Sequence, residues 1–410
     1  MENINILGDF ELKNKNILVR VDLNVPVSHG KIVDNSRIAR VIPTIEYLLE
    51  REAKIILLSH FGRPKGQYDP SLSLAPIVDA LNKFLPKDRP AKFCVDCIGD
   101  NAKEAVAKLR SGEVLLLENL RFYAGEESND EDFAKELAML GDIYINDTFS
   151  CSHRSHASIS ALPKFLPAGI GVLFQEELSN VEANLMKPER PFAAIVGGSK
   201  ISSKLNLLDN LVKDADILVI GGGMANSFLK AQNINIGTSI CEDDLLETAK
   251  NILANAKKHN CKIILPEDVV IADGLDNIGH CEVVNVHNVP ADKMILDVGP
   301  YSTIEIITNL KKCKTIVWNG PLGAFEFRPF NVATETVARA VAYHTQNKDL
   351  LSVAGGGDVV AALTNSYLKD SFTYLSTAGG AFLEWLEGKE SPGIRALQDN
   401  FTQDLAKKAS

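Results

Sequence analysis

Four short apolar runs in the second half of the chain each end at a glycine-rich turn. The runs cover residues 192–196, 217–220, 315–318 and 350–354, and helical patterns follow them. This succession predicts a strand, a tight turn and a helix each time. In an open parallel sheet such turns gather at the carboxyl edge, where ligands bind. Because glycine lets backbone N–H groups approach a phosphate beside a helix start, the pattern predicts a nucleotide phosphate site.

The first half of the chain has the same rhythm. Apolar runs that predict strands cover residues 16–21, 54–58, 112–117 and 142–145. Amphipathic patterns that predict helices cover residues 35–52, 73–84 and 130–140. Such alternation predicts an α/β fold with a mainly parallel sheet and helices on both faces.

The length of 410 residues favours two domains, since a single core rarely grows so large. An amphipathic stretch at 174–186, ended by Pro188 and Pro191, predicts a joining helix. We therefore expect two Rossmann-like domains, at 1–173 and 191–393, joined by an inter-domain helix or hinge at 174–190. Residues 394–410 form a polar tail with a short helical pattern.

The charge pattern favours a small anionic ligand. The net charge is −10, which argues against nucleic acid or an anionic membrane as the main partner. Nine of the thirteen arginines nevertheless precede residue 172, which indicates a local basic site. Residues 1–15 have no signal-peptide core, and no stretch suits a membrane span. The seven scattered cysteines fit reduced thiols, so we expect a cytoplasmic protein in which Cys94 and Cys97 are ordinary thiols.

In the second half, Lys200 and Lys204 follow a Gly-Gly turn at helical spacing. On one helix face they would bind a polyphosphate, although two solvated surface lysines are the plain alternative. Asp358 follows three glycines and could hold Mg²⁺ beside a nucleotide, or serve as a helix N-cap, or both. Glu326 could accept hydrogen bonds from ribose hydroxyls, although a surface glutamate is the default.

In the first half, polar and basic groups follow the predicted strands. Asp22 and Asn24 lie two apart and so point to the same side of an extended segment. The basic groups nearby are Arg37, Arg63, Arg121, Arg154, His60 and His153. Together they would surround a ligand with carboxylate and phosphate groups, which arginine binds in bidentate fashion. For any single arginine a structural ion pair is an equal alternative. The spacing of His153 and His156 does not support a zinc site.

Nine motifs make the chain resemble phosphoglycerate kinase. They are RVDLNVP (20–26), SHFGRP (59–64), ENLRF (118–122), SHRSHAS (152–158), GGSKISSK (197–204), GGGMA (221–225), WNGPLGAFE (318–326), GGGD (355–358) and STAGGA (376–381). They fall in family order and span nearly the whole chain. The resemblance implies reversible phosphoryl transfer between 1,3-bisphosphoglycerate and ADP, giving 3-phosphoglycerate and ATP, with Mg²⁺. It also implies that the first domain takes 3-phosphoglycerate, the second takes ATP or ADP, and the tail packs back on the first.

The resemblance assigns roles by position. For the acid substrate it implies Asp22, Asn24, Arg37, His60, Arg63, Arg121 and Arg154. For the nucleotide we expect Gly198, Lys200, Lys204, Gly222, Asn319, Pro321, Glu326, Gly355, Gly356, Gly357 and Asp358. For catalysis we expect Arg37, Lys200, Gly356 and Gly380, with Asp358 at the metal.

Three positions depart from the family pattern. Val359 stands where the family usually has Thr, so it offers no hydroxyl to a phosphate. Residues 149–152 replace a run of small residues, and Ala378 replaces a glycine. None of these changes removes a charged group that the reaction needs, so we expect slower or altered turnover at most.

The chemistry itself predicts domain movement. A carboxylate acceptor is ionised at pH 7 and needs no general base, so catalysis should rest on alignment and positive charge. If the ligands sit on separate domains, they meet only when the domains close, with residues 174–186 and 391–393 absorbing the motion. We expect a monomer. A nicotinamide-dependent oxidoreductase is a rival, but no GxGxxG follows a strand. A nucleotide-binding protein without catalysis is a second rival, favoured only by Val359.

Overall fold

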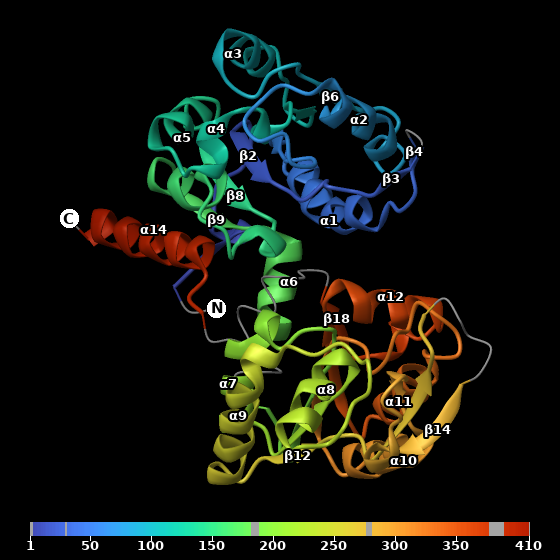
Figure 1. Ribbon diagram of the computed structural model, residues 1–410. Coiled ribbons are helices and arrows are strands. Elements are labelled where there is room, and N and C mark those ends of the chain that lie inside the picture. The colour runs from blue at the N-terminus through green and yellow to red at the C-terminus, as the bar shows by residue number, and fades with distance from the viewer. Residues whose placement is uncertain (1–2, 29–30, 182–187, 276–280, 377–388, 410) are drawn as a thin grey trace. The chain divides into compact units, whose positions relative to one another are not determined.

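The computed structural model describes residues 3–28, 31–181, 188–275, 281–376 and 389–409 (Figure 1). The chain divides into two compact units. The first comprises Met1–Ser179 with Glu390–Ser410, and the second comprises Asn180–Lys389. The prediction of a two-part α/β chain with parallel sheets and flanking helices is confirmed.

The first unit contains a parallel sheet with the strand order β1-β9-β8-β2-β5-β7-β6. The strands are β1 (Asn5–Ile6), β2 (Asn16–Arg20), β5 (Lys54–Leu58), β6 (Ala91–Phe93), β7 (Val114–Leu116), β8 (Ile143–Asn146) and β9 (Ala168–Ile170). The short strands β3 (Val27–Ser28) and β4 (Lys31–Ile32) pair antiparallel. The helices are α1 (Ser36–Glu50), α2 (Ala75–Leu81), α3 (Gly99–Ala107), α4 (Ala124–Glu127), α5 (Glu131–Ala138), α6 (Val172–Val181) and α14 (Pro392–Ala409).

The central strands of this unit are buried on both faces, as parallel strands covered by helices must be. Ile17, Leu18 and Val19 of β2 are fully buried. Asp130 begins α5 as predicted, since its carboxylate accepts from the N–H of Phe133 at 2.7 Å. The predicted helix at 174–186 begins two residues earlier, at Val172, and its residues 182–186 lie outside the described residues.

The C-terminal segment packs within the first unit. Asn400 of α14 donates to the carbonyl oxygens of Pro163 and Leu166, at 2.7 and 2.9 Å, and accepts from the N–H of Ala168 at 2.9 Å. The N–H of Gly393 donates to the carbonyl oxygen of Ser152. These bonds tie α14 to the loops around β9.

The second unit contains a parallel sheet of order β12-β11-β10-β16-β17-β18. Its strands are β10 (Phe192–Val196), β11 (Ile217–Ile220), β12 (Lys262–Ile264), β16 (Thr315–Asn319), β17 (Leu351–Gly355) and β18 (Tyr374–Ser376). When these strands are numbered in chain order, their order across the sheet is 3-2-1-4-5-6, which is the strand order of the Rossmann dinucleotide-binding fold. The helices are α7 (Leu205–Asp214), α8 (Gly222–Ala231), α9 (Leu246–Lys258), α10 (Pro300–Leu310), α11 (Val332–Gln346) and α12 (Gly357–Asn365).

A small antiparallel sheet interrupts the alternation of the second unit. It has the order β14-β13-β15, formed by β13 (Asp268–Ala272), β14 (Glu282–Asn285) and β15 (Met294–Val298). The sequence rhythm did not predict it, because that rhythm implies parallel strands, whereas these strands pair antiparallel. Among the described residues, no helix is long and apolar enough to cross a membrane.

Candidate active site

In the first unit the strand order reverses between β2 and β8, and the motif residues follow the strands around this point. Arg20 ends β2, His60 follows β5, Arg121 follows β7, and residues 147–154 follow β8. A parallel sheet places these strand ends along one edge, where side chains from different loops can meet at a ligand.

Asp22 is the centre of one part of this site. Its carboxylate accepts from Nη1 of Arg37 at 2.6 Å and from the hydroxyl of Ser150 at 2.7 Å. It also accepts from the backbone N–H of Asn24, whose own side-chain oxygen accepts from the N–H of Gly62. Burial raises the pKa of Asp22, but attraction to His60, the Arg37 guanidinium and the Ser150 hydroxyl together outweigh burial, so the pKa lies below its ordinary value. Asp22 is therefore a carboxylate that orients Arg37.

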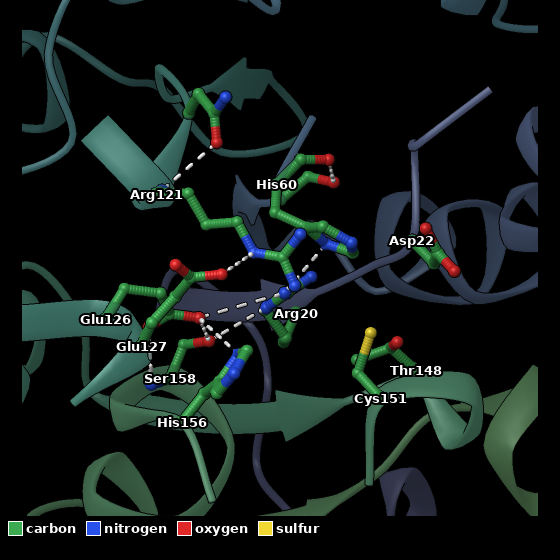
Figure 2. A network of polar contacts seen from close by, with 12 residues as sticks. Arg20, Asp22, His60, Arg121, Glu126, Glu127, Thr148, Cys151, His156 and Ser158 are labelled. Carbon is green, nitrogen blue, oxygen red and sulfur yellow. Dashed lines mark hydrogen bonds and ion pairs between the residues drawn. The ribbon is translucent and has the colours of Figure 1, made fainter. Parts of the chain in front are cut away.

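His60 lies deeper, against Arg20 (Figure 2). Nδ1 of His60 is 3.0 Å from Nη2 of Arg20, and both side chains are buried. Burial, followed by the charge of Arg20, holds the pKa of His60 well below its usual value. His60 is therefore a neutral imidazole, and the cations of this site are arginines.

Arg121 is buried and held by a carbonyl and a carboxylate. Its Nη1 donates to the carbonyl oxygen of Gly62 at 2.8 Å, and its Nε lies 3.2 Å from Oε1 of Glu127. Arg154 is partly buried and contacts His153. Arg63 is exposed, so it is free to turn toward a ligand at the rim.

The histidines after β8 do not form a metal site. Burial lowers the pKa of His153 to about 4 and that of His156 to about 3, with Arg154 adding to the first shift and Arg121 to the second. Neutral imidazole could bind a metal, but no group of three or more His, Cys, Asp or Glu side chains with metal-site geometry occurs within the described ranges. Cys94 and Cys97 are buried free thiols.

Asn119 shapes this site, although the sequence analysis did not single it out. Its amide group donates to the carbonyl oxygens of Phe61 and Leu72 and accepts from the N–H of Phe61. These bonds fix the loop that carries His60 and Arg63. The signal in the sequence was its place in the motif at 118–122, shortly after a strand and two residues before Arg121.

In the second unit the strand order reverses between β10 and β16, and the glycine turns meet there. A Cβ on Gly197 would collide with the carbonyl oxygen of Pro321, so the two turns approach as closely as glycine allows. Gly198 and Gly320 have φ values of 118° and 91°, which glycine adopts without strain. Both turns would therefore contribute backbone groups to a ligand site at this edge of the sheet.

The expectation that Lys200 and Lys204 share a helix face is wrong. Lys200 is exposed in the loop before a 3₁₀ turn at Ser202–Lys204, and Lys204 is the N-cap of α7. The ammonium group of Lys204 donates to the carbonyl oxygens of Gly197 and Asn319, at 2.6 and 3.3 Å. Burial lowers the pKa of Lys204 to about 8, partly opposed by the charge of Asp358. The loop separates the lysines into one half-buried and one exposed cation.

The GGGD turn begins α12, but Asp358 is not its N-cap. Gly356 is the N-cap, with φ 104°, and Asp358 is exposed in the first turn of the helix. Asn319 packs against this turn, because its Nδ2 donates to the carbonyl oxygen of Gly355 at 2.6 Å. Val359 is buried in the core of the second unit. Gly380 lies outside the described residues.

A cavity of about 240 Å³ opens beside these turns. Gly198, Gly222, Pro321 and Asp358 of the turns line this cavity, and the exposed carboxylate of Glu326 also contributes to its lining. The rest of the lining is mainly apolar, with Leu229, Ile240, Val269, Met294, Leu296 and Leu322. An apolar pocket that continues from glycine turns suits a purine ring joined to phosphates.

The donor set fits a magnesium ion carried by a nucleotide. Mg²⁺ beside phosphates uses one or two protein carboxylates and completes its shell with phosphate oxygens and water. Asp358 supplies one exposed carboxylate at the cavity. A protein-only cage would need several carboxylates, and no such cluster occurs in the described part of the chain.

Comparisons with known proteins agree with this geometry. The family model described as phosphoglycerate kinase matches residues 7–389. The phosphoglycerate kinase of Ruegeria sp. is 54% identical over 96% of this chain and 98% of its own, and that of Rhizobium meliloti is 54% identical over 95% and 97%. The solved phosphoglycerate kinase of Coxiella burnetii matches with a TM-score of 0.88 at 38% identity, covering 97% of this chain and 99% of its own. The solved phosphoglycerate kinase of Pyrococcus horikoshii matches with a TM-score of 0.81 at 30% identity, and it covers the same shares of the two chains.

Proposed function

The chain belongs to the phosphoglycerate kinase family, and we propose that its first unit binds 3-phosphoglycerate while its second unit binds ATP or ADP. The enzyme is a phosphotransferase that interconverts 1,3-bisphosphoglycerate plus ADP with 3-phosphoglycerate plus ATP, a step of glycolysis and gluconeogenesis. One observation carries the assignment of the two ligands. In each unit the polyanion-binding groups follow the strands on both sides of the point where strand order reverses.

The first unit suits the acid substrate because its acidic and basic side chains can bind different parts of that molecule. Asp22 and Asn24 can hydrogen-bond a hydroxyl or hold Arg37, while His60, Arg63, Arg121 and Arg154 provide donors for a phosphate. Arg37 is placed by Asp22 with its side chain 39% exposed, so it can turn to a reacting group. We assign Arg37 to the negative charge that develops on the transferring phosphoryl group.

The nucleotide suits the second unit. Lys204 lies at the joined glycine turns and would hold the non-transferring phosphates, while exposed Lys200 would reach the transferring one. Gly356 and the first N–H groups of α12 would bind phosphate oxygens, and Glu326 would accept from the ribose. Asp358 would hold Mg²⁺, which when bound neutralises phosphate charge. Gly380 is proposed as a catalytic position on the family resemblance alone.

Because the two ligands are assigned to different units, transfer requires the units to close and bring the reacting atoms together. Closure would also keep the acyl phosphate from water. Small-angle scattering tests this step: the radius of gyration should fall when both ligands are added, and fall less with either one alone. An unchanged radius with both ligands contradicts closure.

We further propose that the enzyme acts as a monomer in the cytoplasm on small molecules, without nucleic-acid or membrane partners. The net charge of −10 supports the last point. Light scattering during gel filtration tests the monomer, since a dimer would double the measured mass.

A coupled assay tests the activity. ATP and 3-phosphoglycerate are supplied, and the 1,3-bisphosphoglycerate formed is reduced by an added dehydrogenase with loss of NADH absorbance. Turnover that depends on both substrates supports the assignment. A protein that binds ATP but gives no turnover would instead support the non-catalytic alternative, and NADH oxidation without the added dehydrogenase would support an oxidoreductase.

A further inference from the structure

Arg20 is a buried cation that the site described above does not use for binding. It ends β2, its side chain is fully buried, and it is held at three points. Figure 2 shows its contacts with Ser158 and His60. Nε donates to the hydroxyl of Ser158 at 2.9 Å, Nη1 donates to the carbonyl oxygen of Val21, and Nη2 lies 3.0 Å from Nδ1 of His60. A guanidinium held on all sides in this way cannot turn to a substrate, but it can orient what it touches.

A carboxylate behind Arg20 balances its charge. Glu126 of α4 is fully buried, and its Oε1 lies 3.9 Å from Nη2 of Arg20. Glu126 also accepts from the hydroxyl of Ser158 at 2.6 Å and from its N–H at 2.9 Å. Ser158 thus donates its single hydroxyl proton to Glu126 and accepts from Arg20. The chain of contacts runs from Glu126 through Ser158 and Arg20 to His60.

This chain determines which nitrogen of His60 carries the proton. A guanidinium has only donors, so the nitrogen that faces it must accept, and in a neutral imidazole the other nitrogen then carries the hydrogen. We propose that Arg20, held by Glu126 and Ser158, is a positioning residue that fixes His60 as the Nε2–H tautomer, so that Nε2–H donates to an oxygen of the acid substrate. No group among the described residues hydrogen-bonds to Nε2 of His60, which leaves that donor for a ligand.

The inference depends on the neutral state of His60, which burial and Arg20 favour more strongly than the nearby Asp22 carboxylate opposes it. An imidazolium would donate from both nitrogens whatever its neighbours were, whereas a neutral ring donates from one only. With the proton on Nδ1, Nε2 would present a lone pair to an anionic oxygen and repel it. The tautomer therefore decides whether His60 attracts or repels the substrate. This role rests on the proposed binding of 3-phosphoglycerate in the first unit.

A pair of substitutions at His60 separates the two nitrogens. His60→Gln places an amide nitrogen near the position of Nε2, whereas His60→Asn places it near that of Nδ1. If Nε2–H is the donor, His60→Gln should keep the KM for 3-phosphoglycerate within about threefold, and His60→Asn should raise it about tenfold or more. The KM for ATP should stay unchanged in both variants. Equal effects of the two variants, or the reverse order, overturn the proposal.

Histidine ¹⁵N NMR of the ligand-free enzyme tests the tautomer directly. The ring nitrogens of His60, assigned by their absence in His60→Gln, should show a protonated Nε2 and an unprotonated Nδ1. The double variant Arg20→Met/Glu126→Gln removes both buried charges together, because removing either alone leaves the other unpaired and costs much more stability. In this variant we expect a mixture of tautomers and an approximately tenfold higher KM for 3-phosphoglycerate.

Tyr144→Phe is the matched control. It removes a neighbouring buried hydrogen bond, from the Tyr144 hydroxyl to the carbonyl oxygen of Ser158, without touching His60. It should keep the wild-type tautomer and KM. A pure Nε2–H tautomer in the Arg20→Met/Glu126→Gln variant overturns the proposal, and if that variant does not fold, the His60 pair decides. Since the NMR measurement needs no substrate, it can fail while the enzyme is active, which distinguishes this inference from the proposed function.

Discussion

The ammonium group of Lys204 lies 2.6 Å from the carbonyl oxygen of Gly197, at the point where the glycine turns after β10 and β16 meet. The contact orients the cation before any nucleotide binds. The cation is also partly removed from water there, and this burial lowers the pKa of Lys204 to about 8 despite the nearby charge of Asp358.

This pKa predicts a pH dependence of ATP binding. As the pH rises above about 8, Lys204 loses its charge in the free enzyme, so ATP affinity should fall. Lys204→Met should weaken ATP binding about tenfold or more at pH 7 and remove this fall. Calorimetric titration with ATP from pH 7 to 9.5 measures both effects. Parallel pH profiles for the wild type and the variant would contradict the assignment.

The same pKa affects stability in a defined direction. Between pH 8 and the ordinary value of 10.5, the unfolded chain binds a proton at Lys204 that the folded chain has released. The free energy of unfolding should therefore rise with pH in this window, and it should rise less in Lys204→Met. Urea unfolding of the two proteins at pH 8 and pH 10 tests this, and equal increases would show that another group is responsible.

Arg37→Ala should separate activity from stability. The Arg37 side chain is 39% exposed, and Asp22 keeps its bonds from Ser150 and Asn24 without it, so the loss of stability should be small. A cation on the transferring phosphoryl group, by contrast, changes turnover about a hundredfold or more. Turnover in the coupled assay should therefore collapse while the urea midpoint barely moves. Arg51→Ala, at the other end of α1, is the control and should keep full activity. Near-normal turnover of Arg37→Ala would refute its catalytic role.

Asp147 should make the first unit less stable as the pH rises. It is fully buried behind the start of α6, where it accepts from the N–H of Phe174 at 2.9 Å, and burial raises its pKa to about 7. Between pH 4 and 7 the folded chain keeps a proton that the unfolded chain releases, so stability falls across this window. Asp147→Asn cannot ionise but keeps an acceptor, so its unfolding midpoint in urea should change less from pH 4.5 to 7.5. An equal change would exclude Asp147 as the source.

Asn400→Ala should destabilise the first unit. The side chain makes three hydrogen bonds to backbone groups around β9 and is 7% exposed, so its loss leaves buried polar groups unsatisfied. We expect a loss of about 1–3 kcal/mol in urea unfolding. Thr402→Ala, on an exposed part of the same helix, should cost far less. A midpoint like that of the control would mean that α14 contributes little to the unit.

Val359→Thr tests the departure from the family pattern. Val359 is 1% exposed and packs in the core of the second unit, so a hydroxyl there must be satisfied within α12 or turn toward a phosphate. We expect a change of less than about threefold in the KM for ATP, and any change should be a decrease, because the backbone N–H of residue 359, in the first turn of α12, is available to a phosphate in either variant. A severe loss of ATP binding would show that the valine acts through packing.

Local patterns predicted much of the fold. The run at 54–58 coincides with β5, and the glycine-ended runs at 192–196 and 217–220 coincide with β10 and β11. Each of these signals lies within a few neighbouring residues, where apolar runs and glycine act directly on the backbone. The Lys200 and Lys204 prediction failed because a helical spacing does not reveal that the helix begins only at Leu205.

The sequence by itself determined the alternation of strands and helices, the glycine turns that open the phosphate edge, and the charged residues that follow the strands. Only the tertiary structure decided how those residues are used. Arg20 meets Ser158 across 138 positions of sequence and also contacts His60. Lys204 is half-buried because two turns more than a hundred residues apart converge on it. Backbone preferences are set by near neighbours, whereas burial, ionisation and hydrogen-bond partners depend on which distant segments the sheet brings together.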